Sequence, residues 1–267
     1  MSSSSGDSGA AARTVARRVA RDLHDDGALA VLLTGSHATG TAHAQSDIDL
    51  IAVYARPRRE RWHATWAISR RDGHLVTVSP HTAARARASF RDPRSIPTSV
   101  PGWREARILV DPTGVAKQLK REARAFSWDA VATACDAWVA EATTGWAEEV
   151  HKLVAMIERR ELLGAAVQRS LLAVRLAPIM ALHRRMLYGS ENRLWDLVVE
   201  SMGEPWASTQ RSALALNGES HEAIAAATLR LYLFASEEIM PLLSEQQREV
   251  VRHARALAQR ALRSSTR

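Results

Sequence analysis

The sequence has few of the residues and patterns that mark secreted or membrane proteins. Its 267 residues include a single cysteine, Cys135, which excludes an intrachain disulfide and a cysteine-built zinc site. No stretch approaches the roughly 18–20 uninterrupted apolar residues that a membrane helix needs. The Ser/Gly-rich residues 1–14 lack the apolar core of a secretory signal. We therefore expect a protein of the reducing cytoplasm with no membrane partner, in which residues 1–11 form a disordered lead.

Lysine is scarce, yet the chain is basic, with a net charge of +7 carried almost entirely by arginine. A basic chain favours partners that carry phosphate, such as a nucleotide or a nucleic acid. The arginines are spread along the whole chain instead of forming one long run. A nucleic-acid partner therefore stays an open alternative that the charge pattern does not favour.

The hydrophobic pattern divides the chain into two halves. The first half has short apolar runs typical of strands, mixed with helical pieces near residues 12–26 and 82–89. We expect the strands at Ala28–Thr34, Ile48–Tyr54, His74–Pro80 (stopped by its proline) and Ala106–Gly114. The second half has only helical spacing, with serine caps at Ser127 and Ser190 and a kink at Pro178. The prediction is a mixed-sheet α/β domain over residues 12–125, followed by an all-α bundle of five or six helices over residues 126–267.

The segment "GSHATGTAHAQSDIDL" (residues 35–50) carries the clearest chemistry. A strand that ends in Gly35-Ser36 and turns into a helix presents free backbone N–H groups to an anion. Asp47 and Asp49 are two residues apart, so on a strand both carboxylates point to the same face. Two adjacent anions repel each other unless a cation lies between them, and Mg²⁺ prefers carboxylates together with substrate phosphates. The pattern favours metal-dependent transfer of a nucleotidyl group.

This segment resembles the G-S-x-A-x-G…S-D-x-D signature of the DNA polymerase β-type nucleotidyltransferases. That family includes enzymes that inactivate aminoglycoside and lincosamide antibiotics by adding AMP. In the helical half, "EEVHK" (residues 148–152) is similar to the E-x-x-x-K arrangement of the kanamycin 4'-nucleotidyltransferase group, and "ALHRRMLYGSENRLWDLVVES" looks like a helix pair of that group. The resemblance covers about residues 30–240. It implies a nucleotidyltransferase domain and a helical bundle that completes the substrate cleft.

The resemblance also implies a role for each matching residue. Asp47 and Asp49 would be catalytic residues that bind Mg²⁺, and Glu148 would be the general base for the acceptor hydroxyl. The residues expected to bind the nucleotide are Gly35, Ser36, Ser46 and Lys152. Glu149 is an alternative base. An exposed Glu148–Lys152 ion pair with no further role is the alternative for that helix, because residues four apart share one helix face.

Two positions depart from the family pattern. Thr77, in "LVTVSP", stands where the family has a third carboxylate, and Thr39 stands where the family often has an arginine. Three explanations stay open for Thr77. The site could work with two aspartates, with nucleotide and water completing the metal shell. A carboxylate such as Asp72 could replace the third one. The chain could also bind nucleotide without transferring anything.

Other residues near the motif allow two interpretations each. His37 could contact a phosphate or face solvent. Trp62, Trp66 and Trp103 could stack on a base or sugar ring, although packing in the core is favoured.

The function expected from the sequence is Mg²⁺-dependent transfer of a nucleoside monophosphate, AMP in first place, to a hydroxyl of a small molecule. The donor would be ATP or another nucleoside triphosphate, and the acceptor an aminoglycoside-like antibiotic. A neutral or less charged natural product stays open as the acceptor, because the many arginines of the first half argue against a strongly polycationic one. The resemblance implies a homodimer in which both subunits line each cleft. The alternatives are a non-catalytic nucleotide-binding homologue and a nucleotidyltransferase that acts on tRNA or protein.

Overall fold

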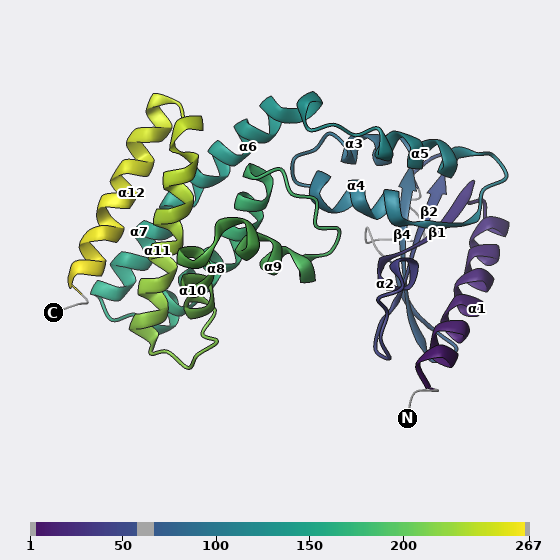
Figure 1. The fold of residues 1–267 in the computed structure, drawn as a ribbon, viewed down its shortest axis with the longest axis horizontal. Coiled ribbons are helices and arrows are strands. Elements are labelled where there is room, and N and C mark those ends of the chain that lie inside the picture. Colours follow the sequence, from purple (N-terminus) through teal and green to yellow (C-terminus); the bar gives the residue numbers. More distant parts are fainter. Residues whose placement is uncertain (1–3, 58–66, 265–267) are drawn as a thin grey trace. The chain divides into compact units, whose positions relative to one another are not determined.

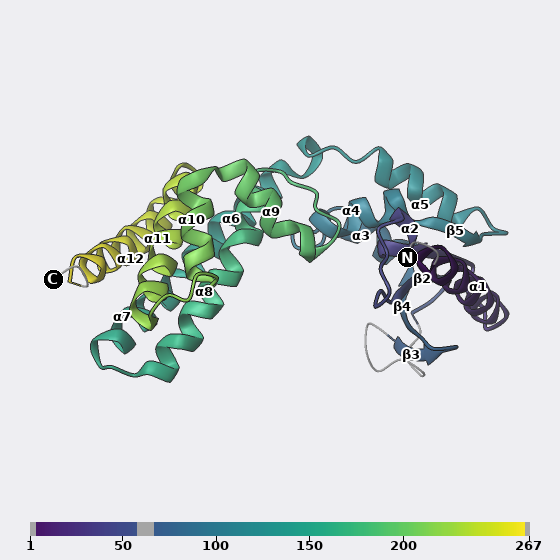
Figure 2. The same ribbon diagram turned by 60° about the horizontal axis from the view of Figure 1, so that its bottom comes forward.

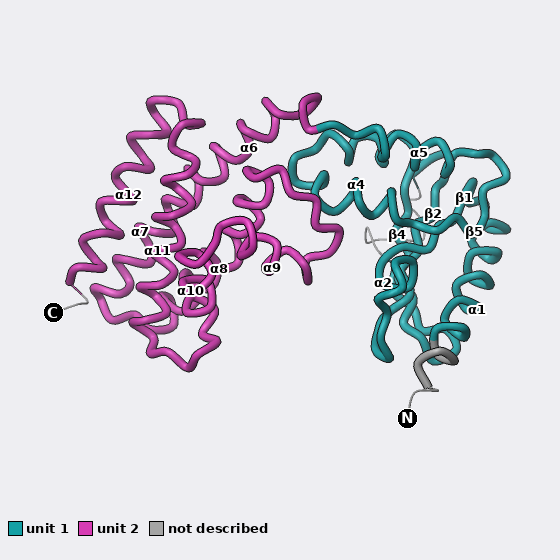
Figure 3. The backbone as a smooth tube through the Cα atoms, viewed as in Figure 1, with its two compact units in different colours: residues 1–127 teal, residues 128–267 magenta. Residues whose placement is uncertain are grey.

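The chain folds into two compact units, residues 1–127 and 128–267 (Figure 3). The structure, a computed structural model, describes residues 4–57 and 67–264. The division lies two residues beyond the boundary expected from the sequence.

Unit 1 is built on a mixed five-stranded sheet with the strand order β3-β4-β2-β1-β5. Strands β2 and β4 are parallel, and the other neighbours are antiparallel. The bounds are β1 Ala30–Thr34, β2 Ile48–Tyr54, β3 Ala67–Arg71, β4 His74–Thr82 and β5 Arg107–Val110. The mixed sheet confirms the predicted fold class of this half.

Helices cover both faces of this sheet (Figures 1 and 2). They are α1 Ser4–Asp25, α2 Gly35–Thr39, α3 Ala83–Ser89, α4 Ile96–Glu105 and α5 Val115–Arg124. The buried side of α1 packs with Leu33 of β1 and Leu50 of β2 in one apolar cluster. Because side chains alternate along a strand, Leu32 and Ile51 face the other side, where α4 and α5 contact β1 and α3 contacts β4. Asp49 lies on this second face.

Three features of unit 1 differ from the sequence-based expectation. Residues 4–11 were expected to be disordered, but they form the first turns of α1, which is anchored on the sheet from Ala12 onward. Strand β4 does not stop at Pro80 but runs on to Thr82. It pairs in parallel with β2 as far as Tyr54↔Thr82, and this pairing carries the strand past Pro80. Strand β3 was not predicted, because its polar edge sequence leaves Ile68 67% exposed.

Unit 2 is entirely helical in the part that the structure describes. Its α-helices are α6 Ala132–Gly145, α7 Ala147–Glu158, α8 Leu162–His183, α9 Glu191–Met202, α10 Glu204–Ala213, α11 His221–Ile239 and α12 Glu245–Ser264. Short 3₁₀ turns η1 (Asp129–Val131) and η2 (Met240–Leu242) precede α6 and α12. Ser190 caps α9 as predicted, since its side chain accepts a hydrogen bond from the Asn192 N–H. The bundle has one helix more than expected, because the short α10 follows α9 after a single glycine.

Helix α8 forms the centre of the bundle. By length and composition it could cross a membrane, with a mean hydropathy of 1.3, but half of that apolar window is buried inside the unit. It contacts α6, α7, α9 and α11, and Leu172, Leu176 and Met180 are fully buried. The helix continues across Pro178. Its apolar character is therefore that of a core helix of the bundle.

Candidate active site

The Gly-Ser loop joins β1 to the short helix α2. The Ser36 carbonyl accepts hydrogen bonds from the Gly40 N–H at 2.9 Å and the Thr41 N–H at 3.0 Å. Gly40 ends the helix in the left-handed region with φ of +87°. Thr39, at the position where the family often has arginine, donates its hydroxyl to the Ser36 carbonyl at 3.2 Å. Its side chain therefore stabilises the turn from within.

Gly35 is required at its position by Asp49. In the antiparallel pairing of β1 and β2, Asp49 lies opposite Thr34, the residue just before the loop. A Cβ atom added to Gly35 would lie 2.4 Å from Asp49 Oδ2, and Gly35 has φ of +65°. Any other residue would both clash and be strained. The absence of a side chain thus lets the Asp49 carboxylate lie directly against the backbone of the loop.

Asp47 and Asp49 form a coupled acidic pair. Asp49 is half-buried, and desolvation by burial, followed by the charge of Asp47, raises its pKa to about 6. The intervening Ile48 and the following Leu50 are buried toward the opposite face. The electrostatic coupling of the two carboxylates agrees with the expectation that both side chains point to the same face of the strand. A bound cation would relieve their repulsion.

A threonine hydroxyl lies beside the acidic pair. In the parallel pairing of β2 and β4, Thr77 lies beside Asp49. Its hydroxyl donates to Asp47 Oδ2 at 3.4 Å, and Thr77 is 8% exposed. Asp72, the alternative carboxylate, lies in the β3–β4 turn and is paired with Arg18 of α1. Asp72 is therefore engaged elsewhere in the structure.

The carboxylate pair is the donor set available for a divalent cation in unit 1. Among the described residues, no three His, Cys, Asp or Glu side chains come together as a metal-binding group. Mg²⁺ commonly binds one or two carboxylates and completes its shell with substrate phosphates and water. Asp47 and Asp49, next to the loop that begins at Gly35, fit that requirement. They do not resemble a zinc site.

The loop before Asp47 is closed by Ser46 and lies near His37. The Ser46 hydroxyl accepts from the His43 N–H at 2.9 Å. His37 is half-buried, and its Nε2 is buried with no hydrogen-bond partner among the described residues. Burial lowers the pKa of His37, against the opposing effect of the Ser46 main chain. The His37 ring thus faces inward. The sequence had suggested only contact with a phosphate or exposure to solvent.

Glu148 and Lys152 lie on one face of α7, as predicted from their spacing. Lys152 Nζ lies 2.9 Å from Glu148 Oε1 and 3.0 Å from Glu149 Oε1. The Glu148 side chain is 72% exposed, whereas that of Glu149 is 17% exposed. These three residues belong to unit 2 and form a second charged cluster.

The tryptophans considered as stacking platforms are only partly described. Trp103 is 1% exposed and packs edge-to-face on His81 and Phe90, with ring centroids 6.1 and 6.2 Å apart. It is therefore a core residue. Trp62 and Trp66 lie outside the described residues.

Comparison with known proteins agrees with this architecture. Residues 15–109 match the model of the family described as nucleotidyltransferase domain, a segment that contains Gly35, Asp47, Asp49 and Thr77. The chain is similar in structure to a nucleotidyltransferase-like protein from Exiguobacterium sibiricum, with a TM-score of 0.52 and 12% identity over 85% of this chain and 74% of that one. At this identity the likeness shows the fold alone. A search of curated proteins finds no match. The fold is thus a nucleotidyltransferase-type domain followed by a helical unit, and the domain supports nucleotidyl transfer in general.

Proposed function

We propose that this protein is a Mg²⁺-dependent nucleotidyltransferase that moves AMP from ATP to a hydroxyl group of an aminoglycoside-like small molecule. The observation that carries the proposal is the half-buried Asp49 carboxylate, held against Gly35 and coupled to Asp47. Burying part of a charged pair costs free energy unless a ligand compensates it. A divalent cation that is shared with a triphosphate is such a ligand.

In this proposal, unit 1 holds the donor nucleotide. The Gly35 backbone and the Ser36 hydroxyl bind the triphosphate, and Ser46 keeps the loop closed before Asp47. Asp47 and Asp49 would hold Mg²⁺, which when bound neutralises phosphate charge and polarises the phosphoryl group. Thr77 orients Asp47 through its hydroxyl. The chain's contribution is to place these groups before the nucleotide arrives.

The transfer itself is a single displacement at the α-phosphorus. The acceptor oxygen forms a bond to that phosphorus, the bond to the oxygen bridging to the β-phosphate breaks, and pyrophosphate leaves. Glu148 takes the proton from the acceptor hydroxyl, and Lys152 holds Glu148 and contacts the phosphates. Glu149 is the alternative base, because its carboxylate is the more buried of the two.

The distribution of charge supports a cationic acceptor. Residues 1–127 contain 20 Lys and Arg against 12 Asp and Glu, a net charge of +8, whereas residues 128–267 contain 16 against 17, a net charge of −1. The positive charge therefore lies with the unit that would bind the triphosphate. The unit that carries Glu148 lacks this excess and is compatible with a polyamine-like acceptor.

The neutral Thr77 favours a second candidate, a homologue that binds nucleotide without transfer. To separate the candidates, the protein is incubated with Mg²⁺, labelled ATP or GTP, and a panel of aminoglycosides, lincosamides, tRNA and protein. Pyrophosphate release that depends on a small acceptor supports the proposal. Nucleotide binding without turnover selects the non-catalytic homologue, and labelled tRNA or protein selects a macromolecular acceptor. Either result overturns the proposal.

The roles on α7 are tested by matched substitutions. Glu148→Gln should lower kcat by about 10²–10⁴-fold, the usual contribution of a general base, with little change in the KM for ATP. Glu158→Gln, on the same helix, should leave kcat unchanged. If Glu149→Gln shows the loss and Glu148→Gln does not, the base is Glu149.

We also propose a homodimer, which an apolar stripe on α8 supports. Leu163, Val167, Leu171 and Val174 recur at helical spacing and are 82%, 49%, 38% and 39% exposed. Such a stripe is self-complementary when two copies of the helix pack across a two-fold axis. Light scattering should give a dimer that Leu163→Glu converts to a monomer, whereas Leu216→Glu, at another exposed leucine, should not. A monomeric wild-type protein would contradict the dimer.

A further inference from the structure

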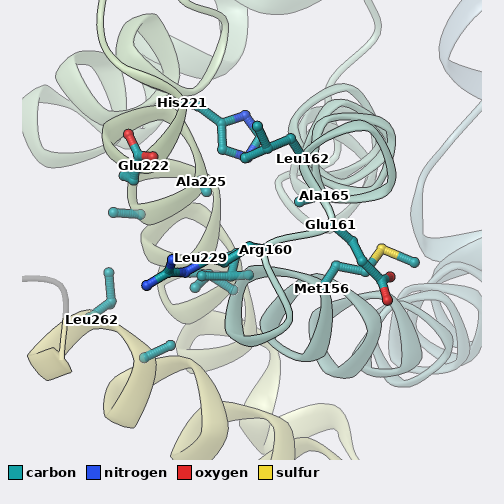
Figure 4. Close-up of a pocket in the computed structure, with 13 residues that line it drawn as sticks. Met156, Arg160, Glu161, Leu162, Ala165, His221, Glu222, Ala225, Leu229 and Leu262 are labelled. Atoms are coloured by element: carbon teal, nitrogen blue, oxygen red, sulfur yellow. The ribbon is translucent and has the colours of Figure 1, made fainter.

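A cavity lies in unit 2, at the opposite end of α7 from Glu148. Its volume is about 360 Å³, and it is formed where the end of α7 and the start of α8 meet α11 and the end of α12 (Figure 4). Its wall is largely apolar, with Met156, Leu162, Ala165, Ala225, Leu229 and Leu262. A cavity of this size is within the range of small-molecule sites, about 300–1,000 Å³.

The wall of the cavity is tightly packed. A Cβ atom added to Gly164 would lie 2.8 Å from Met156 Sδ, so the Met156 side chain lies against the bare backbone of α8. Ala225 and Leu229 are 1% exposed and lie one turn apart on α11. The small residues Ala165 and Ala225 on facing helices leave the space that larger side chains would fill. The cavity is thus defined by residue size on rigid helices.

Arg160 supplies a positive charge to this apolar cavity. Figure 4 shows its side chain extending from the end of α7 toward Leu229 and Leu262. It makes no ion pair with any residue in the ranges 4–57 and 67–264. Its backbone is left-handed, with φ of +59°, a conformation that costs a non-glycine residue roughly 1–2 kcal/mol. The turn therefore holds this arginine in a strained conformation, next to an apolar cavity.

The two carboxylates in the cavity wall are already engaged by other groups. Glu161 accepts two hydrogen bonds from Arg159, at 2.6 and 3.0 Å. Glu222 lies in the first turn of α11, where its own N–H and the Ser220 hydroxyl lower its pKa. The remaining polar residue of the wall is His221. Arg160 is the arginine of the wall, and no carboxylate among the described residues forms an ion pair with it.

We propose that this cavity binds a small amphipathic carboxylate, with the apolar chain between the helices and the carboxylate on Arg160. Arginine presents a planar fork of donors that matches a carboxylate. A volume of about 360 Å³ lies at the lower end of the range of small-molecule sites, which suits a linear acid of about ten heavy atoms. Octanoate has this size and charge. The site is independent of the proposed nucleotidyl transfer.

The test is isothermal titration of the full chain with three probes of equal chain length: octanoate, 1-octanol and octylammonium. The expected result is saturable binding of one octanoate, at least tenfold tighter than 1-octanol, with no binding of octylammonium. The tenfold preference is the smallest effect expected for one charge-assisted hydrogen-bonded pair. Absence of saturable octanoate binding, or equal binding of acid and alcohol, overturns the proposal.

Three variants, each checked for folding by circular dichroism, locate the site. Arg160→Gln should remove the preference for the acid while leaving alcohol binding unchanged. Arg230→Gln, an exposed arginine of α11 that does not line the cavity, should retain the preference. Ala226 of α11 also lines the cavity, so Ala226→Phe fills it and should abolish binding of both probes. Unchanged octanoate binding by a folded Arg160→Gln or Ala226→Phe protein would contradict the assignment.

Discussion

Replacing Asp49 with asparagine should stabilise unit 1 while abolishing nucleotidyl transfer. The pKa of Asp49 is about 6 in the folded protein and 3.8 without the fold. The folded state therefore holds the proton more tightly, and the stability of the wild type falls as the pH rises between these two values. Above about pH 6 the carboxylate is ionised and lowers the free energy of unfolding by about 2 kcal/mol, a value that allows for its partial exposure.

Asparagine has nearly the same shape but does not ionise. We therefore expect Asp49→Asn to be more stable than the wild type by about 2 kcal/mol near pH 8, and by almost nothing below about pH 4. Thermal unfolding of the unit 1 transition at both pH values, without Mg²⁺, measures the difference. Asp22→Asn, at an exposed carboxylate of α1, is the matched control and should change stability by less than about 0.5 kcal/mol.

Asp49→Asn also tests whether the stability of unit 1 depends on bound Mg²⁺ and nucleotide. Mg²⁺ with a nucleoside triphosphate should stabilise the wild type, because the cation favours the ionised pair, and should stabilise Asp49→Asn far less. The reasoning is refuted if Asp49→Asn is less stable than the wild type near pH 8, or if its gain in stability is the same at both pH values.

Three further substitutions test the surroundings of the site and the helical unit. Gly35→Ala should destabilise unit 1 by about 2–3 kcal/mol and abolish transfer. Gly40 also has a positive φ but has open space around it, so Gly40→Ala should destabilise the unit by only about 1 kcal/mol. If chemical denaturation shows equal losses of stability for the two variants, the clash with Asp49 is contradicted. Thr77→Asp should lower the melting temperature without Mg²⁺ and recover it with Mg²⁺, and a loss that Mg²⁺ does not reverse would contradict a shared cation site. Ser190→Ala should destabilise unit 2 by about 1 kcal/mol through loss of the α9 cap, and no change in urea unfolding would contradict the capping role.

The sequence predicted the class of each half because the evidence was local. Strand β2 was expected at Ile48–Tyr54 and lies there, since its apolar run is bounded by polar turns. Strand β3 was missed because Ile68, its one large apolar residue, is exposed and the strand has no apolar alternation. The extension of β4 past Pro80 depends on its parallel pairing with β2, which sequence spacing does not determine.

The local part of the candidate site could be predicted from the sequence, but its long-range contacts could not. The motif placed Gly35, Asp47 and Asp49 near one another, because loop and strand follow each other directly. The hydroxyl of Thr77 on Asp47 depends on the register of β4 against β2, which sequence spacing does not determine. The engagement of Asp72 by Arg18 joins residues 54 positions apart, so no local pattern could show it.

The cavity of unit 2 left no signal in the sequence. It depends on alanines of α8 and α11 that face each other and on the left-handed Arg160 between two helices. Alanine is common at helix positions of every kind, and arginine has no preference for positive φ. Only the packed structure distinguishes these residues from others of their type.

The most direct test of the central claim is a titration of the protein with Mn²⁺, a paramagnetic substitute for Mg²⁺, in the presence of a non-hydrolysable ATP analogue. Electron paramagnetic resonance counts the ions that are bound. The account predicts saturable binding of Mn²⁺ that requires the nucleotide and is lost when Asp47 and Asp49 are both replaced by asparagine. Equal binding by the wild type and the folded double variant would contradict it.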